Sequence, residues 1–293
     1  MTRPSKALSI AVLCLAAFSV TSQSAGAQRK MLTPAEGAKF QVLLHTAHDN
    51  CLRYDTVDKA ISAADQALKI APNNPEALCI KGSALMTKEE DQAALQCFDL
   101  AYNAYPQAYP LQGKANCLLK LKRKDEALAC IDQALKLEPT TEGRKLRAKI
   151  LLQFNRWQEA KHDLDLVIAE REKEKNRDRL YLLFPRADRA DIEMHLKQWA
   201  GALDDLNYCL NDPKLQIQQG NYEQILKRGQ VYKELKQYDK AIADYKWALK
   251  INPDFRQTHL GLAEVYSAAG KEDLAKAEMK IVAELDQDLA PIK

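Results

Sequence analysis

An alanine recurs seven times along this chain of 293 residues, each time within the same local pattern of apolar residues. The seven positions are Ala60, Ala94, Ala127, Ala160, Ala202, Ala241 and Ala275. The intervals between them are 34, 33, 33, 42, 39 and 34 residues, and the apolar residues around each alanine follow helical spacing. A period near 34 residues with this spacing predicts a stack of helical hairpins and excludes a single closed core.

The clearest copy of the pattern begins at Ile225 and ends at Pro253, and another runs from Leu78 to Pro106. Each copy starts with apolar residues along one face of a helix, continues through a short polar break, and closes with a second amphipathic helix. Small residues such as Gly229 are expected where the two antiparallel helices cross closely.

This order of large, small and aromatic residues resembles the tetratricopeptide repeat family over nearly all of the chain after residue 27. The resemblance implies an all-α fold, a right-handed superhelical solenoid of about seven helix-turn-helix repeats. The first copy departs from the pattern, because His48 and Cys51 stand where a small and a large residue are usual. A charged run, residues 170–179, lengthens the fourth interval, and we interpret it as a solvated helix extension.

The expected organisation has four parts. Residues 1–27 form a signal peptide, 28–40 an N-terminal stub and helix extension, 41–180 a block of four repeats with the charged extension, and 181–293 a block of three. Thr33, Pro34 and Glu36 combine an N-cap, a first-turn proline and a capping-box glutamate, so ordered helix should begin near residue 34.

The first 27 residues have the three parts of an export signal. Arg3 and Lys6 precede an apolar run over residues 7–20, and Ala25 and Ala27 form a small-residue cleavage site before Gln28. The chain is therefore expected to be exported, to the periplasm or the medium. A retained anchor is the alternative, although the run is shorter than the roughly 20 residues that span a bilayer. We expect no membrane span after cleavage.

Charge and cysteine content narrow the functional class. A net charge of +3 provides no global field for nucleic acid. Six cysteines follow the signal, and an even number in an exported protein permits disulfides. They occupy places for small hydrophobic residues, which favours buried thiols over disulfides. The six are Cys51, Cys79, Cys97, Cys117, Cys130 and Cys209.

No motif for catalysis, phosphate binding or a cofactor occurs in the chain, so we expect no enzyme, no cofactor and no metal. The only spacing like that of metal ligands is His45, His48 and Cys51 along one helical stripe. We interpret His48 and Cys51 as packed core residues because of their places in the repeat.

Three arginines lie sixteen residues before an aspartate, each arginine on the first helix of a hairpin and the aspartate on the second. The couples are Arg147 with Asp163, Arg189 with Asp205, and Arg228 with Asp244. Where the basic residue is Lys81 or Lys114, the matching place holds Cys97 or Cys130. This covariation predicts structural ion pairs within the hairpins.

The family resemblance implies a concave face lined by the first helices, which commonly receives an extended peptide or a partner helix. Carried over by register, the candidate partner-binding residues are Leu52, Met86, Gln112, Asn116, Leu119, Lys145 and Lys149. The expected function is an exported scaffold that binds a protein or peptide, in envelope assembly or secretion. The alternative is a binder of a small molecule, glycan or metal inside the superhelix.

Overall fold

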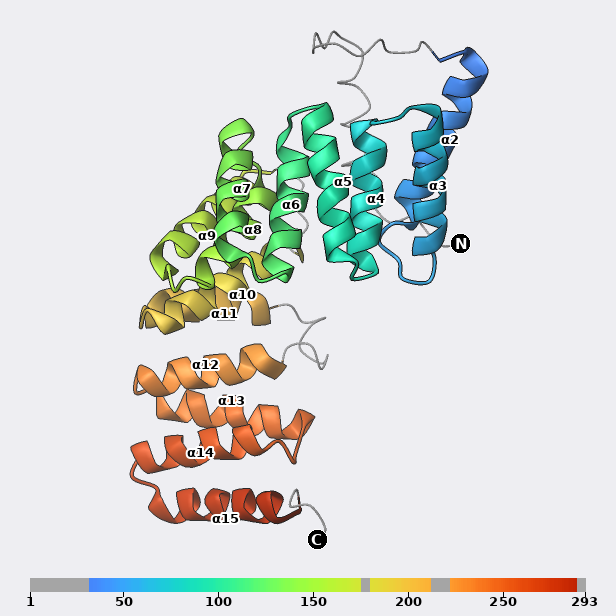
Figure 1. Cartoon of the computed structure of the whole chain (residues 1–293). Helices are drawn as coiled ribbons and strands as arrows, with labels where there is room; N and C mark the ends of the chain where they lie inside the picture. The colour runs from blue at the N-terminus through green and yellow to red at the C-terminus, as the bar shows by residue number, and fades with distance from the viewer. Residues whose placement is uncertain (1–31, 175–179, 212–221, 289–293) are drawn as a thin grey trace.

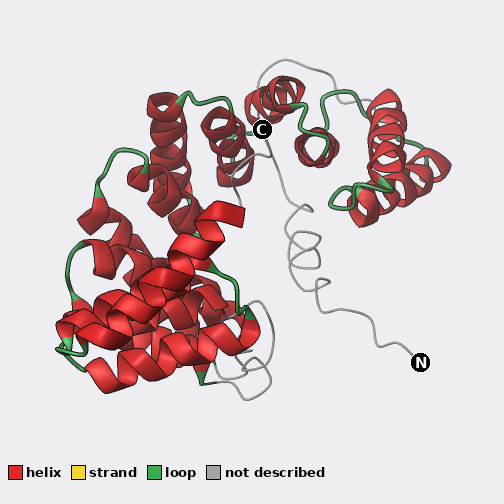
Figure 2. Cartoon of the chain, turned by 90° about the horizontal axis from the view of Figure 1, so that it is seen from below, coloured by secondary structure: helices red, strands yellow, loops and turns green. Residues whose placement is uncertain are grey.

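The computed structural model describes residues 32–174, 180–211 and 222–288, and this part of the chain is helical throughout, without a strand (Figure 2). It forms seven antiparallel hairpins. Their helices are α2 (Pro34–Asn50) and α3 (Val57–Ile70), α4 (Pro75–Thr87) and α5 (Asp91–Ala104), α6 (Ala108–Lys120) and α7 (Lys124–Leu137), α8 (Thr141–Leu152) and α9 (Trp157–Glu172), α10 (Leu180–His195) and α11 (Trp199–Leu210), α12 (Tyr222–Glu234) and α13 (Tyr238–Ile251), and α14 (Arg256–Ala268) and α15 (Glu272–Asp288). The prediction of an all-α solenoid is confirmed.

Each of the seven alanines lies in the first turns of the second helix of its hairpin, and each is buried. Six have no exposed surface and Ala275, in the last hairpin, keeps 6%. A methyl group at this place lets the two helices approach closely, so the alanine period records the helix crossings.

Helix starts and turns also follow the sequence. Thr33 and Glu36 form the capping box expected at the start of α2. Asn74 and Thr140 cap α4 and α8 in the same way, by accepting hydrogen bonds from backbone N–H groups. In the last six hairpins the residue five before the alanine has a positive φ between 56° and 71°, and only Gly270 among the six is a glycine.

Two aromatic side chains fill the helix crossings where glycines stand. Phe98 on α5 lies against Gly82 of its own hairpin and Gly113 of the next, and Tyr245 on α13 lies in the same way between Gly229 and Gly261. A Cβ atom at Gly113 would come within 2.4 Å of the Phe98 ring. The glycines are therefore required by the rings that pack on them.

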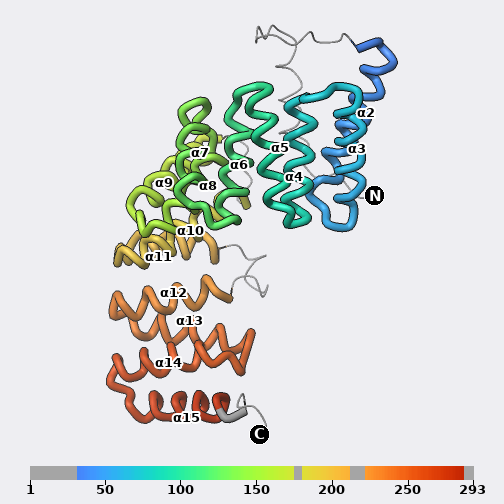
Figure 3. The backbone as a smooth tube through the Cα atoms, in the orientation of Figure 1, coloured from blue at the N-terminus to red at the C-terminus, as the bar shows by residue number. Residues whose placement is uncertain are grey.

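Successive hairpins stack in chain order, and the array changes direction between α9 and α11 (Figures 1 and 3). First helices of neighbouring hairpins contact each other, as α4 does with α2 and α6, and α12 with α14, whereas no two successive second helices touch to a similar extent in the described structure. Because the helices that lie closer together line the inside of a curved stack, the first helices form the inner face.

The charged run, residues 170–179, was expected to be a solvated extension of a helix, and this expectation needs revision in two respects. The helix that was expected to continue through the charged run ends at Glu172, and residues 175–179 lie outside the described residues. Arg171 is not simply solvated, because its guanidinium donates hydrogen bonds to Thr141 and Glu142 at the start of α8.

The proposed signal peptide also lies outside the described residues, and the division into blocks of four and three stays a prediction.

Candidate functional site

The three arginine–aspartate couples are in direct contact, each through two hydrogen bonds. Arg147 reaches Asp163 at 2.7 and 2.6 Å, Arg189 reaches Asp205 at 2.7 and 2.8 Å, and Arg228 reaches Asp244 at 2.8 and 2.7 Å. The aspartates are buried while the arginine side chains keep 15–27% of their surface exposed. This parallel, bidentate geometry is the one for which a guanidinium is suited and an ammonium is not.

The same arginines also bind the preceding hairpin, which the sequence reasoning missed. Each uses its remaining nitrogen, Nη1, on a polar side chain five residues after the preceding alanine: Asp132 at 3.3 Å, Asp165 at 2.7 Å and Asn207 at 3.2 Å. Lys81 and Lys114, which have a cysteine in place of the aspartate of their own hairpin, make only the contact to the preceding hairpin. Lys81 pairs with Asp65 at 2.7 Å and Lys114 with Asp99 at 2.6 Å. The aspartate that recurs five residues after an alanine was the available signal.

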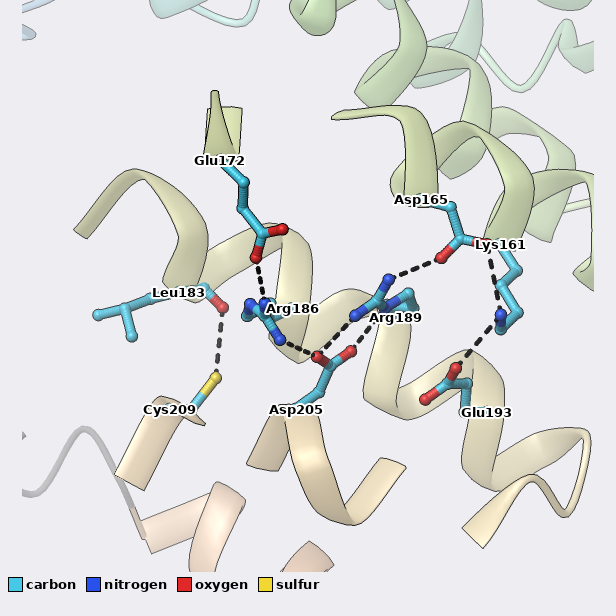
Figure 4. A network of polar contacts seen from close by, with 9 residues as sticks. All are labelled: Lys161, Asp165, Glu172, Leu183, Arg186, Arg189, Glu193, Asp205 and Cys209. Atoms are coloured by element: carbon cyan, nitrogen blue, oxygen red, sulfur yellow. Dashed lines mark hydrogen bonds and ion pairs between the residues drawn. The ribbon is translucent and has the colours of Figure 1, made fainter. Parts of the chain in front are cut away.

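A network of charged side chains joins the fourth and fifth hairpins (Figure 4). Asp205 is fully buried and accepts hydrogen bonds from both Arg186 and Arg189 of α10. Arg186 also binds Glu172 at the end of α9, and Arg189 binds Asp165 on the same helix. The network therefore joins α9, α10 and α11 and belongs to the scaffold.

Glu193 is an unusual member of this junction. It lies nine residues before Ala202, a place that holds Leu85, Leu118 or Leu151 in other hairpins. The side chain is buried, Oε1 lies 3.3 Å from Nζ of Lys161, and Oε2 has no hydrogen-bond partner among the described residues. Burial raises the pKa of this carboxyl, and the charge of Asp205 adds to the rise.

The structure separates the predicted partner-binding residues into three groups. Leu52 is not on a first helix, because α2 ends at Asn50 and a six-residue connection follows, held by the hydroxyl of Thr87 donating to the carbonyl of Cys51. Met86 and Leu119 are half-buried against the core of the second and third hairpins. Their side chains therefore support packing more than they form a surface.

The polar candidates also differ from one another. Gln112 donates to the hydroxyl of Thr140 at 2.8 Å, and Lys145 pairs with Glu142 at 2.6 Å. Asn116 and Lys149 make no such bond to any residue that the structure describes. Both lie eleven residues before their alanine, so they occupy equivalent places on the neighbouring helices α6 and α8.

Family models of the tetratricopeptide repeat match residues 56–109, 108–141 and 226–255. The chain contains tetratricopeptide repeats. No curated protein matches it.

Several solved structures share the tetratricopeptide fold. Pseudomonas aeruginosa pilF aligns with a TM-score of 0.63 at 16% identity, covering 80% of this chain and 99% of its own. YrrB, described as a TPR protein with an unusual peptide-binding site, aligns at 0.56 with 16% identity, over 67% of this chain and 95% of its own. MamA from Desulfovibrio magneticus RS-1 aligns at 0.55 with 16% identity, over 62% and 97%. At these identities the likeness shows the fold alone.

Two aromatic residues on the inner face of the repeats were missed by the sequence reasoning. Tyr109 on α6 and Phe184 on α10 are 56% and 77% exposed, and each lies eighteen residues before its alanine. Asp188, one turn after Phe184, is within electrostatic reach of Lys145 and Lys149. Desolvation raises the pKa of Asp188, and these lysines oppose the rise. The inner face thus has aromatic and acidic groups beside the predicted lysines.

The first repeat corrects one further expectation. The side chain of His48 is 51% exposed and contacts Asp49, so it is not a core histidine, whereas Cys51 is buried as expected. The register shifts because Phe40, Leu44 and Ala47 supply the buried face of α2. Among the described residues, no three His, Cys, Asp or Glu side chains are grouped to hold a metal.

The six cysteines are free thiols, five of them buried and Cys130 partly buried. Burial raises the pKa of Cys79 and of Cys117 to about 12, so both thiols stay protonated at neutral pH. No described helix is long and apolar enough to cross a bilayer.

Proposed function

We propose that the protein is an exported, non-catalytic scaffold that binds an extended peptide segment of a protein partner along the inner face of its repeats. Envelope assembly or secretion is the process that such a scaffold would serve. The proposal of export rests on the composition of residues 1–27 and predicts that protein from the native host begins at Gln28.

The observation that carries the binding proposal is the pair Asn116 and Lys149. They occupy equivalent places on adjacent first helices, and neither side chain is engaged by the described part of the scaffold. An amide can both donate to and accept from a peptide backbone, and a lysine provides a point charge for a carboxylate. Tyr109, on the same helix as Asn116, and Phe184, on the first helix that follows that of Lys149, supply exposed aromatic surface.

The three partly buried arginines are excluded from this site because their guanidinium groups are occupied by scaffold carboxylates and Asn207. The peptide-binding site named in the description of YrrB shows that a protein of this fold can bind peptide, which supports the proposal by analogy.

Peptides selected from a random displayed library on the mature protein test the proposal. We expect peptides with an acidic residue or a free carboxyl end. Their affinity should fall at least about tenfold in the double variant Asn116→Ala/Lys149→Glu, because a charge-assisted hydrogen bond is lost and a repulsion replaces it. Lys136→Glu, on the exposed side of α7, makes the same charge change and should leave affinity unaltered. Equal loss in both variants would show that the inner face is not the site.

A further inference from the structure

A hollow opens on the inner face between α12 and α14, in the last two repeats. It encloses about 340 Å³ and lies over Tyr245, whose ring is buried and whose hydroxyl lies beside Gly261. Leu226 forms an apolar side, and Gln230 and Gln257 stand on opposite helices. The volume is near the lower end for ligand pockets in proteins and suits one side chain with its flanking backbone.

The equivalent place between α4 and α6 is bridged by two side chains, in contrast to the hollow. There Phe98 replaces Tyr245, and Tyr109 and Ser83 occupy the places of Gln257 and Gln230. The hydroxyl of Tyr109 lies 3.3 Å from that of Ser83 and bridges the two helices over the Phe98 ring. The two places therefore differ at these three positions. They differ also at Leu226, Lys227, Lys233 and Glu264, whose places are held by Cys79, Ile80, Met86 and Asn116.

The charged side chains at the rim of the hollow are paired with one another. Lys233 lies 2.7 Å from Glu264, and Lys227 lies 2.7 Å from both Glu223 and Asp191. A ligand of strong charge would have to break one of these pairs. The rim is consequently complementary to an uncharged segment.

Three polar groups in the hollow stay available. The amides of Gln230 and Gln257 and the hydroxyl of Tyr245 make no hydrogen bond within the described residues. Burial raises the pKa of Tyr245, and Glu264 adds to the rise, so the hydroxyl remains a donor at neutral pH. One donor on the floor and two amides on the walls match the carbonyl and N–H groups of a peptide in extended form.

We infer that this hollow is a second peptide subsite, which takes an uncharged, extended segment and seats one apolar side chain against Leu226. Its backbone carbonyl accepts from Tyr245, and the glutamine amides pair with the flanking peptide groups. The inference rests on the proposed function, since it assigns a second anchor on the same inner face.

Parallel selections from one random displayed peptide library test the subsite. One uses the mature wild-type chain, and the other uses the full-length mature Asn116→Ala/Lys149→Glu variant, in which the first site is disabled. We expect the variant still to select peptides, and these to share an apolar residue flanked by uncharged ones. The affinity of these peptides should fall at least about tenfold when the variant also carries Gln230→Ser/Gln257→Tyr. These two changes copy Ser83 and Tyr109, which bridge α4 and α6.

A change on the outer side of the same repeat is the control. Lys246→Ser, at an exposed residue of α13, should not weaken these peptides, and circular dichroism should show unchanged helicity in every variant. The subsite is refuted if only the wild-type chain selects peptides, if Gln230→Ser/Gln257→Tyr changes affinity less than twofold, or if the peptides retained by the variant are charged. In each of these cases the proposed function stands, whereas failure of both selections would refute that function.

Discussion

Single residues at the junction of the fourth and fifth repeats hold charges that the scaffold must keep paired. Asp205 is fully buried and is the shared acceptor of Arg186 and Arg189. Asp65, in contrast, keeps 44% of its side chain exposed while it pairs with Lys81. The two carboxylates make the same type of contact in very different surroundings.

Asp205→Ala should lower the free energy of unfolding by about 3–5 kcal/mol, because it leaves two arginines without their acceptor in a mostly buried place. Asp65→Ala should cost at most about 1 kcal/mol, since water replaces the lost partner. Urea denaturation followed by circular dichroism measures both. Similar costs for the two variants would contradict the structural role assigned to the buried pairs.

The raised pKa of Glu193 predicts that the stability of the fold depends on pH. Because its pKa in the folded state is raised above the ordinary 4.5, the folded chain holds this proton to higher pH than the unfolded chain does. The contribution to stability is therefore greatest below pH 4.5 and declines as pH rises through the folded pKa.

Glu193→Gln removes this titration and keeps the size of the side chain. The variant should be more stable than wild type by about 1–2 kcal/mol at pH 7, and the difference should shrink towards pH 4. Lys161 keeps Asp165 as a partner in the variant. Parallel urea titrations across this pH range measure the difference, and a gap that widens on acidification would have the wrong sign.

A side-chain contact could be predicted from the sequence only where both partners belong to one hairpin. The fixed separation of Arg147 and Asp163 is visible in the chain. The bond from Arg147 to Asp132 is not, because it depends on how hairpins stack. The engagement of Gln112 by Thr140 was hidden for the same reason.

At the scale of helices, glycines at the crossings should tolerate no side chain. Gly113→Ala places a methyl group within 2.4 Å of the Phe98 ring and should cost about 1–3 kcal/mol. Gly37→Ala is the matched control, because nothing lies within 4 Å of its added Cβ in α2, and it should stabilise by about 0.5–1 kcal/mol. Melting temperatures that move in the same direction would contradict this account of the crossings.

Helix positions were predictable because the alanine period and helical spacing are local signals. The connection that carries Leu52 was not, because the first copy lacks the turn used by the other six. Its position was inferred from the register of regular copies, and α2 ends before that register would place it. Irregular copies are thus where inference from the repeat fails.

For the molecule as a whole, stacking of similar hairpins leaves one extended surface shared by every repeat. The inner face of the first helices is that surface, and its equivalent places differ in chemistry along the chain, from Asn116 and Lys149 to Gln230. The central claim is that a partner segment lies along this face, while the second helices form the outside of the scaffold.

Site-specific photocrosslinking in the native host tests that claim most directly. A photoreactive benzoylphenylalanine is introduced at Lys149 or Gln230 on the inner face, or at the exposed residues Lys136 or Lys246 of second helices. The account predicts cross-links to a partner from the two inner positions and none from the two outer ones. Cross-links from the outer positions alone would contradict it.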